Sequence, residues 1–182
     1  MYMCKKTFLS IIVAIFCFGM LIYCNKPVDN GNPDIVGTFT WTEWQKKSGW
    51  KDHSASDYLP DSACVKTLST FIDEHSNADI KFEIYASNWC HADCATQLPK
   101  IIKFLKEAGI NENDIIIYGL NRTKAEPFDA MQKWENNFPN EVCRVPTLVI
   151  YFNNYVGKVK CESQDYPEWQ CKIYDELMCA NL

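Results

Sequence analysis

The residues of this chain best suited to chemistry are two cysteines in the stretch NWCHADCATQLP, residues 88–99. Cys90 follows Trp89 near the N-terminus of a predicted helix, and Cys94 stands one helical turn later, after three intervening residues. Free N–H groups and the helix dipole stabilise a thiolate near a helix N-terminus. Helical i, i+4 spacing places the two Cα atoms about 6 Å apart, a separation that a disulfide tolerates. The pair could therefore be a redox dithiol, a pair of metal ligands or an inert structural disulfide.

The segments on either side of the motif must hold the two thiols in place. Residues 79–86 alternate apolar and polar side chains, which predicts a strand that leads into the motif. A helix is predicted after it, to about Ala108, where Gly109 ends the pattern. Apolar runs predict three further strands, at 114–120, 145–152 and 155–160.

Four other helices are predicted from apolar residues at helical spacing, at 40–50, 60–76, 126–138 and 166–180. Gly49 should end the first, Asp61 or Ser62 should cap the second, and Pro127 lies near the first turn of the third. Strands separated by helices favour parallel pairing, whereas the last two strands form an antiparallel hairpin. The sequence thus predicts an α/β fold, with a mixed central sheet and helices on both faces.

The first 23 residues read as a signal peptide or membrane anchor. A basic start is followed by an apolar run at 7–23, and LIYC resembles a bacterial lipobox, which predicts lipidation of Cys24. An uncleaved single span and ordinary signal cleavage are the alternatives, and all three export the rest of the chain. Residues 24–38, rich in Asn, Asp, Pro and Gly, read as a tether, and 39–182 as one domain.

The amino-acid composition indicates the cellular compartment of the protein and argues against one class of partner. Ten cysteines in 182 residues are unusual for a cytosolic protein and favour an extracytoplasmic location. Loss of the two leader lysines from 18 basic residues leaves 16 against 23 acidic ones, a formal charge of −7. An acidic domain without a basic run is unsuited to nucleic acid, whose binding depends on cations that neutralise phosphates.

The motif and its surroundings resemble the thioredoxin family. Trp89-Cys90, the second cysteine and Pro99 five residues after it resemble the family's active site. The stretch Val145-Pro146-Thr147 resembles its second hallmark, a cis proline before a strand, and YVGKV resembles the hairpin that follows. The resemblance runs from about residue 79 to the end, and it implies a thioredoxin-like fold.

The function implied by this resemblance is thiol–disulfide exchange with protein partners, without a cofactor. Cys90 would attack a partner's disulfide and Cys94 would resolve the mixed disulfide, with Trp89, Val145 and Pro146 contacting the substrate. The exposed backbone of Val145 would pair with the partner's extended chain. An unidentified redox partner would recycle the site. The protein itself would be exported and anchored to a membrane of a bacterial cell envelope.

The sequence departs from the family at two points. Three residues separate the cysteines where the family has two, and Ile84 stands where thioredoxin has a buried acid. Glu83 is adjacent to that position but should point to the opposite face of the strand. Proton transfer at Cys94 must then use another group or water, and Glu162 and His91 are the candidates.

Two other classes of function remain open. The spacing and anchor also resemble copper chaperones of the Sco type, since thiolates suit Cu(I). Those proteins need a histidine far downstream, whereas this chain has only His53, His75 and His91. No metal ligand set is therefore assigned. A non-catalytic binding module on the same fold is the third possibility.

The remaining cysteines raise a pairing question. Five are left in the mature chain outside the dithiol, an odd number. Cys161, at the end of a strand, and Cys171, at the start of the last helix, are the favoured second pair. Cys143, three residues before Pro146, is either a small buried apolar residue or a third redox thiol.

Overall fold

The computed structural model describes residues 33–50, 55–90, 93–161 and 169–179. Within them, five strands form one sheet in the order β1-β3-β2-β4-β5. β2 and β3 pair in parallel, and the other neighbouring strands pair antiparallel. The mixed α/β sheet predicted from the sequence is confirmed. The strands are β1 (Gly37–Phe39), β2 (Ile80–Ala86), β3 (Ile115–Gly119), β4 (Thr147–Phe152) and β5 (Tyr155–Lys160).

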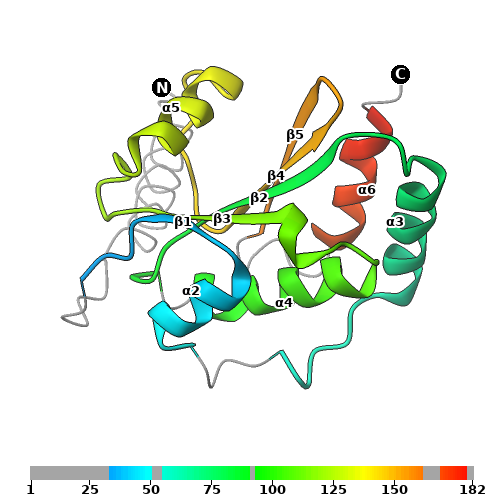
Figure 1. Ribbon diagram of the computed structural model, residues 1–182, viewed down its shortest axis with the longest axis horizontal. Coiled ribbons are helices and arrows are strands. Elements are labelled where there is room, and N and C mark those ends of the chain that lie inside the picture. Colours follow the sequence, from blue (N-terminus) through cyan, green and yellow to red (C-terminus); the bar gives the residue numbers. More distant parts are fainter. Residues whose placement is uncertain (1–32, 51–54, 91–92, 162–168, 180–182) are drawn as a thin grey trace, which may run out of the picture.

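Helices cover both faces of this sheet, as expected. Figure 1 shows α5 above the sheet, α2 and α4 below it, and α3 beside α6 at one end. A short 3-10 turn, η2, precedes β3. The helices are α2 (Trp41–Ser48), α3 (Ser62–Glu74), α4 (Cys94–Glu107), α5 (Phe128–Asn137) and α6 (Trp169–Cys179), and η2 spans Glu112–Asp114.

Local signals in the sequence set several helix ends. Thr40 and Glu43 form a reciprocal capping box at the start of α2, and Gly49 ends that helix in the left-handed conformation. Asp61 caps α3 by accepting hydrogen bonds from the backbone of Ala63 and Cys64. These ends agree with the predicted ones.

The first strand was not predicted. β1 begins at Gly37, inside the range assigned to the tether, and its three residues pair with β3 along Ile117–Gly119. The sheet therefore includes residues before Phe39. Gly119 is required there, because a Cβ atom would lie 2.3 Å from the carbonyl oxygen of Ile35.

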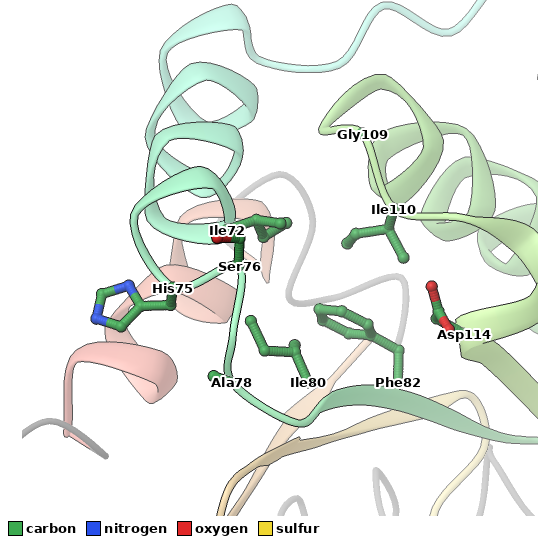
Figure 2. Close-up of a pocket in the computed structure, with 9 residues that line it drawn as sticks. All are labelled: Ile72, His75, Ser76, Ala78, Ile80, Phe82, Gly109, Ile110 and Asp114. Atoms are coloured by element: carbon green, nitrogen blue, oxygen red, sulfur yellow. The ribbon is translucent and has the colours of Figure 1, made fainter.

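The two faces of β2 pack against different layers. Alternate residues of a strand point to opposite faces. The ring of Tyr85 lies 5.1 Å from that of Trp134 in α5. Phe82 points the other way, toward Ile72 in the last turn of α3 and Ile110 in the segment after α4 (Figure 2). Both sides of the sheet are thus filled by side chains.

The expected pairing of Cys161 with Cys171 is wrong. Cys171, in the first turn of α6, is bonded to Cys64, in the first turn of α3, with the two Cα atoms 5.1 Å apart. The backbone N–H of Asp61 donates to Gln170 Oε1 beside this link, at 2.8 Å. Cys161 is fully buried, and its thiol contacts the carbonyl oxygen of Val159 at 3.4 Å. Because α3 and α6 pack side by side, Cys64 and Cys171 are close enough to form the disulfide.

Candidate active site

The dithiol lies where the chain passes from the end of β2 to the start of α4. β2 ends at Ala86, and residues 87–90 lead to Cys90. The helix begins at Cys94, whose backbone N–H donates to the carbonyl oxygen of Cys90 at 2.9 Å. Cys90 therefore precedes the helix, whereas the spacing argument placed both cysteines within it. The N-terminal N–H groups of α4 are close to Cys90 as a result.

Cys90 has the properties of an attacking thiol. It is partly exposed and not bonded to another cysteine. A hydrogen bond from the Cys94 thiol lowers the pKa of Cys90 to about 7, helped by the backbone N–H groups of Cys94 and Asp93. Burial and the charge of Asp93 oppose this shift. A large share of Cys90 is therefore thiolate at neutral pH, the form that attacks disulfides.

Cys94 has the opposite properties. Its side chain is fully buried, and burial raises its pKa well above the usual value, with the neighbouring Cys90 acting in the same direction. Cys94 therefore stays protonated and donates to Cys90. The two thiols are therefore unequal in exposure and in the direction of their pKa shifts. Among the described residues, Ser87 Oγ is the hydroxyl that lies near Cys94 Sγ, at 3.8 Å.

The loop before β4 lies against Cys90. Cys90 Sγ lies 3.9 Å from the carbonyl oxygen of Val145. The Val145–Pro146 bond is cis, as expected, and so is Glu126–Pro127, which was not predicted. Thr147, the first residue of β4, pairs with Tyr85 of β2. Residues about fifty-five positions apart in the sequence thus meet at the dithiol.

Trp89 and its neighbour anchor the segment before Cys90. Trp89 Nε1 donates to the carbonyl oxygen of Leu120 at 3.2 Å, which ties the tryptophan to the end of β3. The Asn88 side chain, 5% exposed, accepts from the backbone of Ile35 at 2.9 Å and donates to the carbonyl oxygen of Pro33 at 3.0 Å. Asn88 was not singled out from the sequence, because no pattern connects it to residues so far upstream.

The buried carboxylate of this region lies on the other face of the sheet. Ile84 is fully buried, and Glu83 is 2% exposed. Glu83 accepts hydrogen bonds from Tyr118 and from Lys133 of α5. The expectation that Glu83 points away from the dithiol face is confirmed. The two proton-transfer candidates named from the sequence, His91 and Glu162, lie outside the described residues.

Cys143 has the properties of a packing residue. It is 3% exposed, and burial raises its pKa to about 12. Its own carbonyl oxygen accepts from Lys124 Nζ at 2.8 Å, which connects the two loops beside the dithiol. A thiol with so high a pKa is a poor nucleophile at neutral pH.

A separate pocket of about 170 Å³ lies at the other end of β2. Ile80 and Phe82 lie at the start of the strand, whereas the dithiol follows its last residue, so the two sites are about 20 Å apart. Figure 2 shows Ile80, Phe82 and Ile110 converging on the cavity, with Asp114 at its rim and the ring of His75 turned away. The pocket takes no part in the dithiol site.

The sequence also predicted a membrane anchor, and it left a metal site open as an alternative. Cys24 and the whole predicted anchor lie outside the described residues. In the part of the chain that is described, no helix is long and apolar enough to cross a membrane. Across those same residues, no group of three or more His, Cys, Asp or Glu side chains could hold a metal ion.

Comparison with protein-family models, with curated proteins and with solved structures finds no match to this chain.

Proposed function

We propose that the chain is a thiol–disulfide oxidoreductase with a thioredoxin-like fold, acting on protein disulfides through Cys90 and Cys94. The observation that carries the proposal is the pairing of a partly exposed thiol of lowered pKa with a fully buried thiol that donates to it. Unequal thiols are what a two-step exchange requires, because one must attack and the other must wait.

Three further features support the fold and the substrate class. The dithiol follows the central strand β2 and precedes α4, and the cis Val145–Pro146 bond lies before β4. The carbonyl oxygen of Val145 is within 3.9 Å of the attacking sulfur, so a bound chain would meet backbone and thiol together. Trp89 adds an aromatic surface beside Cys90. A protein chain in extended conformation is the substrate that such a site suits.

In the proposed reaction, the Cys90 thiolate attacks one sulfur of the partner's disulfide. A Cys90–partner mixed disulfide forms, and the first partner sulfur leaves as a thiolate. Cys94 then loses its proton to that departing thiolate and attacks Cys90 Sγ. The Cys90–Cys94 disulfide forms and the second partner thiolate leaves. The partner gains two electrons, and the dithiol loses them. The reverse sequence would oxidise a partner's dithiol.

The proposed location is outside the cytoplasm, on a membrane anchor that includes Cys24. The Cys64–Cys171 link supports this location, since disulfides persist in oxidising compartments. An unidentified redox partner would recycle the site. Mass spectrometry of membrane-extracted protein should find acyl groups on an N-terminal Cys24, and an intact Met1 would instead identify an uncleaved span.

The test of the proposed function is trapping of the mixed disulfide. The detergent-solubilised full chain is mixed with insulin as the disulfide substrate. Cys94→Ser should accumulate an insulin adduct that maps to Cys90 and is released by reductant, because the resolving thiol is gone. Cys90→Ser is the matched control and should trap almost none. Equal trapping by the two variants would contradict the assigned roles.

A further inference from the structure

Ser87 is a buried hydroxyl placed against the resolving thiol. It follows the last residue of β2, and its side chain is fully buried, like that of Cys94. Ser87 Oγ lies 3.8 Å from Cys94 Sγ, within hydrogen-bond range for sulfur. The strand fixes Ser87 and the first turn of α4 fixes Cys94, so the contact does not depend on a surface loop.

Among the described residues, Ser87 and Cys90 are the ones whose polar groups lie within hydrogen-bond distance of Cys94 Sγ. The strand residue on the dithiol face is Ile84, and the Glu83 carboxylate is on the α5 face with Tyr118 and Lys133. Among the described residues, the titratable group that acts on Cys94 is Cys90, which disfavours a second thiolate.

The backbone and the hydroxyl of Ser87 act in the other direction and favour the Cys94 thiolate. Asp93, which precedes Cys94 in the turn, is a charged neighbour of the pair, and it disfavours a thiolate at Cys90.

We infer that Ser87 donates a hydrogen bond to the Cys94 thiolate as it attacks Cys90, and is therefore a catalytic residue of the resolving step. This inference rests on the proposed exchange reaction. In that step the Cys94 proton goes to the departed partner thiolate. The Cys94–Cys90 bond forms, the Cys90–partner bond breaks, and the partner sulfur leaves with the electron pair. The Ser87 hydroxyl keeps its own proton and turns it toward the sulfur that becomes charged.

The experiment separates the two steps in one reaction. The full chain is mixed rapidly with an aromatic disulfide, dithiobis(nitrobenzoate), quenched in acid at set times, and digested for peptide mapping. The aryl adduct on Cys90 reports the attack, and its conversion into a Cys90–Cys94 disulfide reports the resolution. Mapping by peptide keeps the other cysteines out of the measurement.

Ser87→Ala should leave the rate of adduct formation within about twofold and slow its conversion by about tenfold, the effect of one hydrogen bond to a charged group. The pH midpoint of the conversion should rise, because the Cys94 thiolate has lost a donor. Ser87→Thr, which keeps the hydroxyl, should restore most of the rate. Tyr85→Phe is the matched control, since it removes a buried hydroxyl of the same strand that donates to the carbonyl oxygen of Ala130.

Three outcomes would overturn the inference. Conversion at the wild-type rate and pH midpoint in Ser87→Ala would show that the hydroxyl does not act on Cys94. Equal slowing of both steps, or equal slowing by Tyr85→Phe, would assign Ser87 a packing role. Absence of both a Cys90 adduct and a Cys90–Cys94 disulfide in the wild type would instead refute the proposed function, which is a different result from these.

Discussion

Removal of the Cys64–Cys171 link should cost the domain a large part of its stability. The link closes a loop with a sequence separation of 107 residues. The chain-entropy relation gives about 4.8 kcal/mol at 25 °C for a loop of that length, and native disulfides commonly contribute about 2–5 kcal/mol. We expect Cys64→Ala/Cys171→Ala to lower the free energy of unfolding by about 3–5 kcal/mol, which lowers Tm by roughly 10–15 °C.

The assay is urea unfolding followed by circular dichroism, with and without reductant. The reduced wild type and the double variant should unfold within about 1 kcal/mol of each other, because the entropic term is then absent from both. Cys161→Ala is the matched control, since Cys161 is a fully buried cysteine outside the Cys64–Cys171 link. It should cost about 1 kcal/mol, the loss of a small buried group.

Equal destabilisation by Cys161→Ala and by the double variant, or a double variant as stable as the oxidised wild type, would refute the reasoning. Peptide mapping without reductant gives an independent check, and a Cys161–Cys171 peptide would contradict the structure directly.

The remaining predictions concern single thiols and one buried charge. The alkylation rate of Cys90 with iodoacetamide should rise through a midpoint near pH 7, because the pKa of Cys90 is lowered to about 7. At pH 7 the Cys90 thiol should be about 15-fold more ionised than an unperturbed thiol of pKa about 8.5. A midpoint above pH 8 would contradict this prediction. Cys143 should resist alkylation until the domain unfolds, since it is 3% exposed and its pKa is raised to about 12; modification of the native protein, or a Cys90–Cys143 disulfide on oxidation, would instead indicate a third redox thiol. Glu83→Ala should lower the free energy of unfolding by about 1–3 kcal/mol, because it leaves Tyr118 and the half-exposed Lys133 without their buried acceptor. The control Glu107→Ala breaks a surface ion pair with Lys103 at 4.0 Å and should cost less than about 0.5 kcal/mol. Similar losses in the two variants would contradict the role of burial.

The sequence predicts those parts of the fold that depend on local pattern. The strand before the dithiol, the Asp61 cap and the Gly49 helix end follow from periodicity and capping chemistry, and each is present in the structure. β1 was missed because three residues in a segment rich in turn formers carry no strand pattern. Their pairing with β3 is set by a close approach over Gly119, which is visible only in three dimensions.

Some residues of the candidate site could likewise be predicted from local sequence pattern, whereas others depend on tertiary packing. Cys90, Cys94 and the Val145–Pro146 loop could be named from motif and spacing, and the structure brings them together. The Cys64–Cys171 pairing could not be inferred, because it depends on how α3 packs beside α6. Ser87 also escaped notice, since a serine after a strand is ordinary until the first turn of α4 places a buried sulfur beside it.

Redox titration of the Cys90–Cys94 pair tests the central proposal most directly. The full chain is equilibrated in glutathione buffers from about −120 to −320 mV, quenched in acid, and mapped by peptide mass spectrometry. We predict that the 90–94 disulfide goes from about 10% to 90% formed over roughly 60 mV, as a two-electron couple requires. The Cys64–Cys171 link should stay formed where the 90–94 pair titrates. A 90–94 disulfide that never forms, or one that stays formed as persistently as Cys64–Cys171, would contradict the proposal that these two cysteines exchange disulfides.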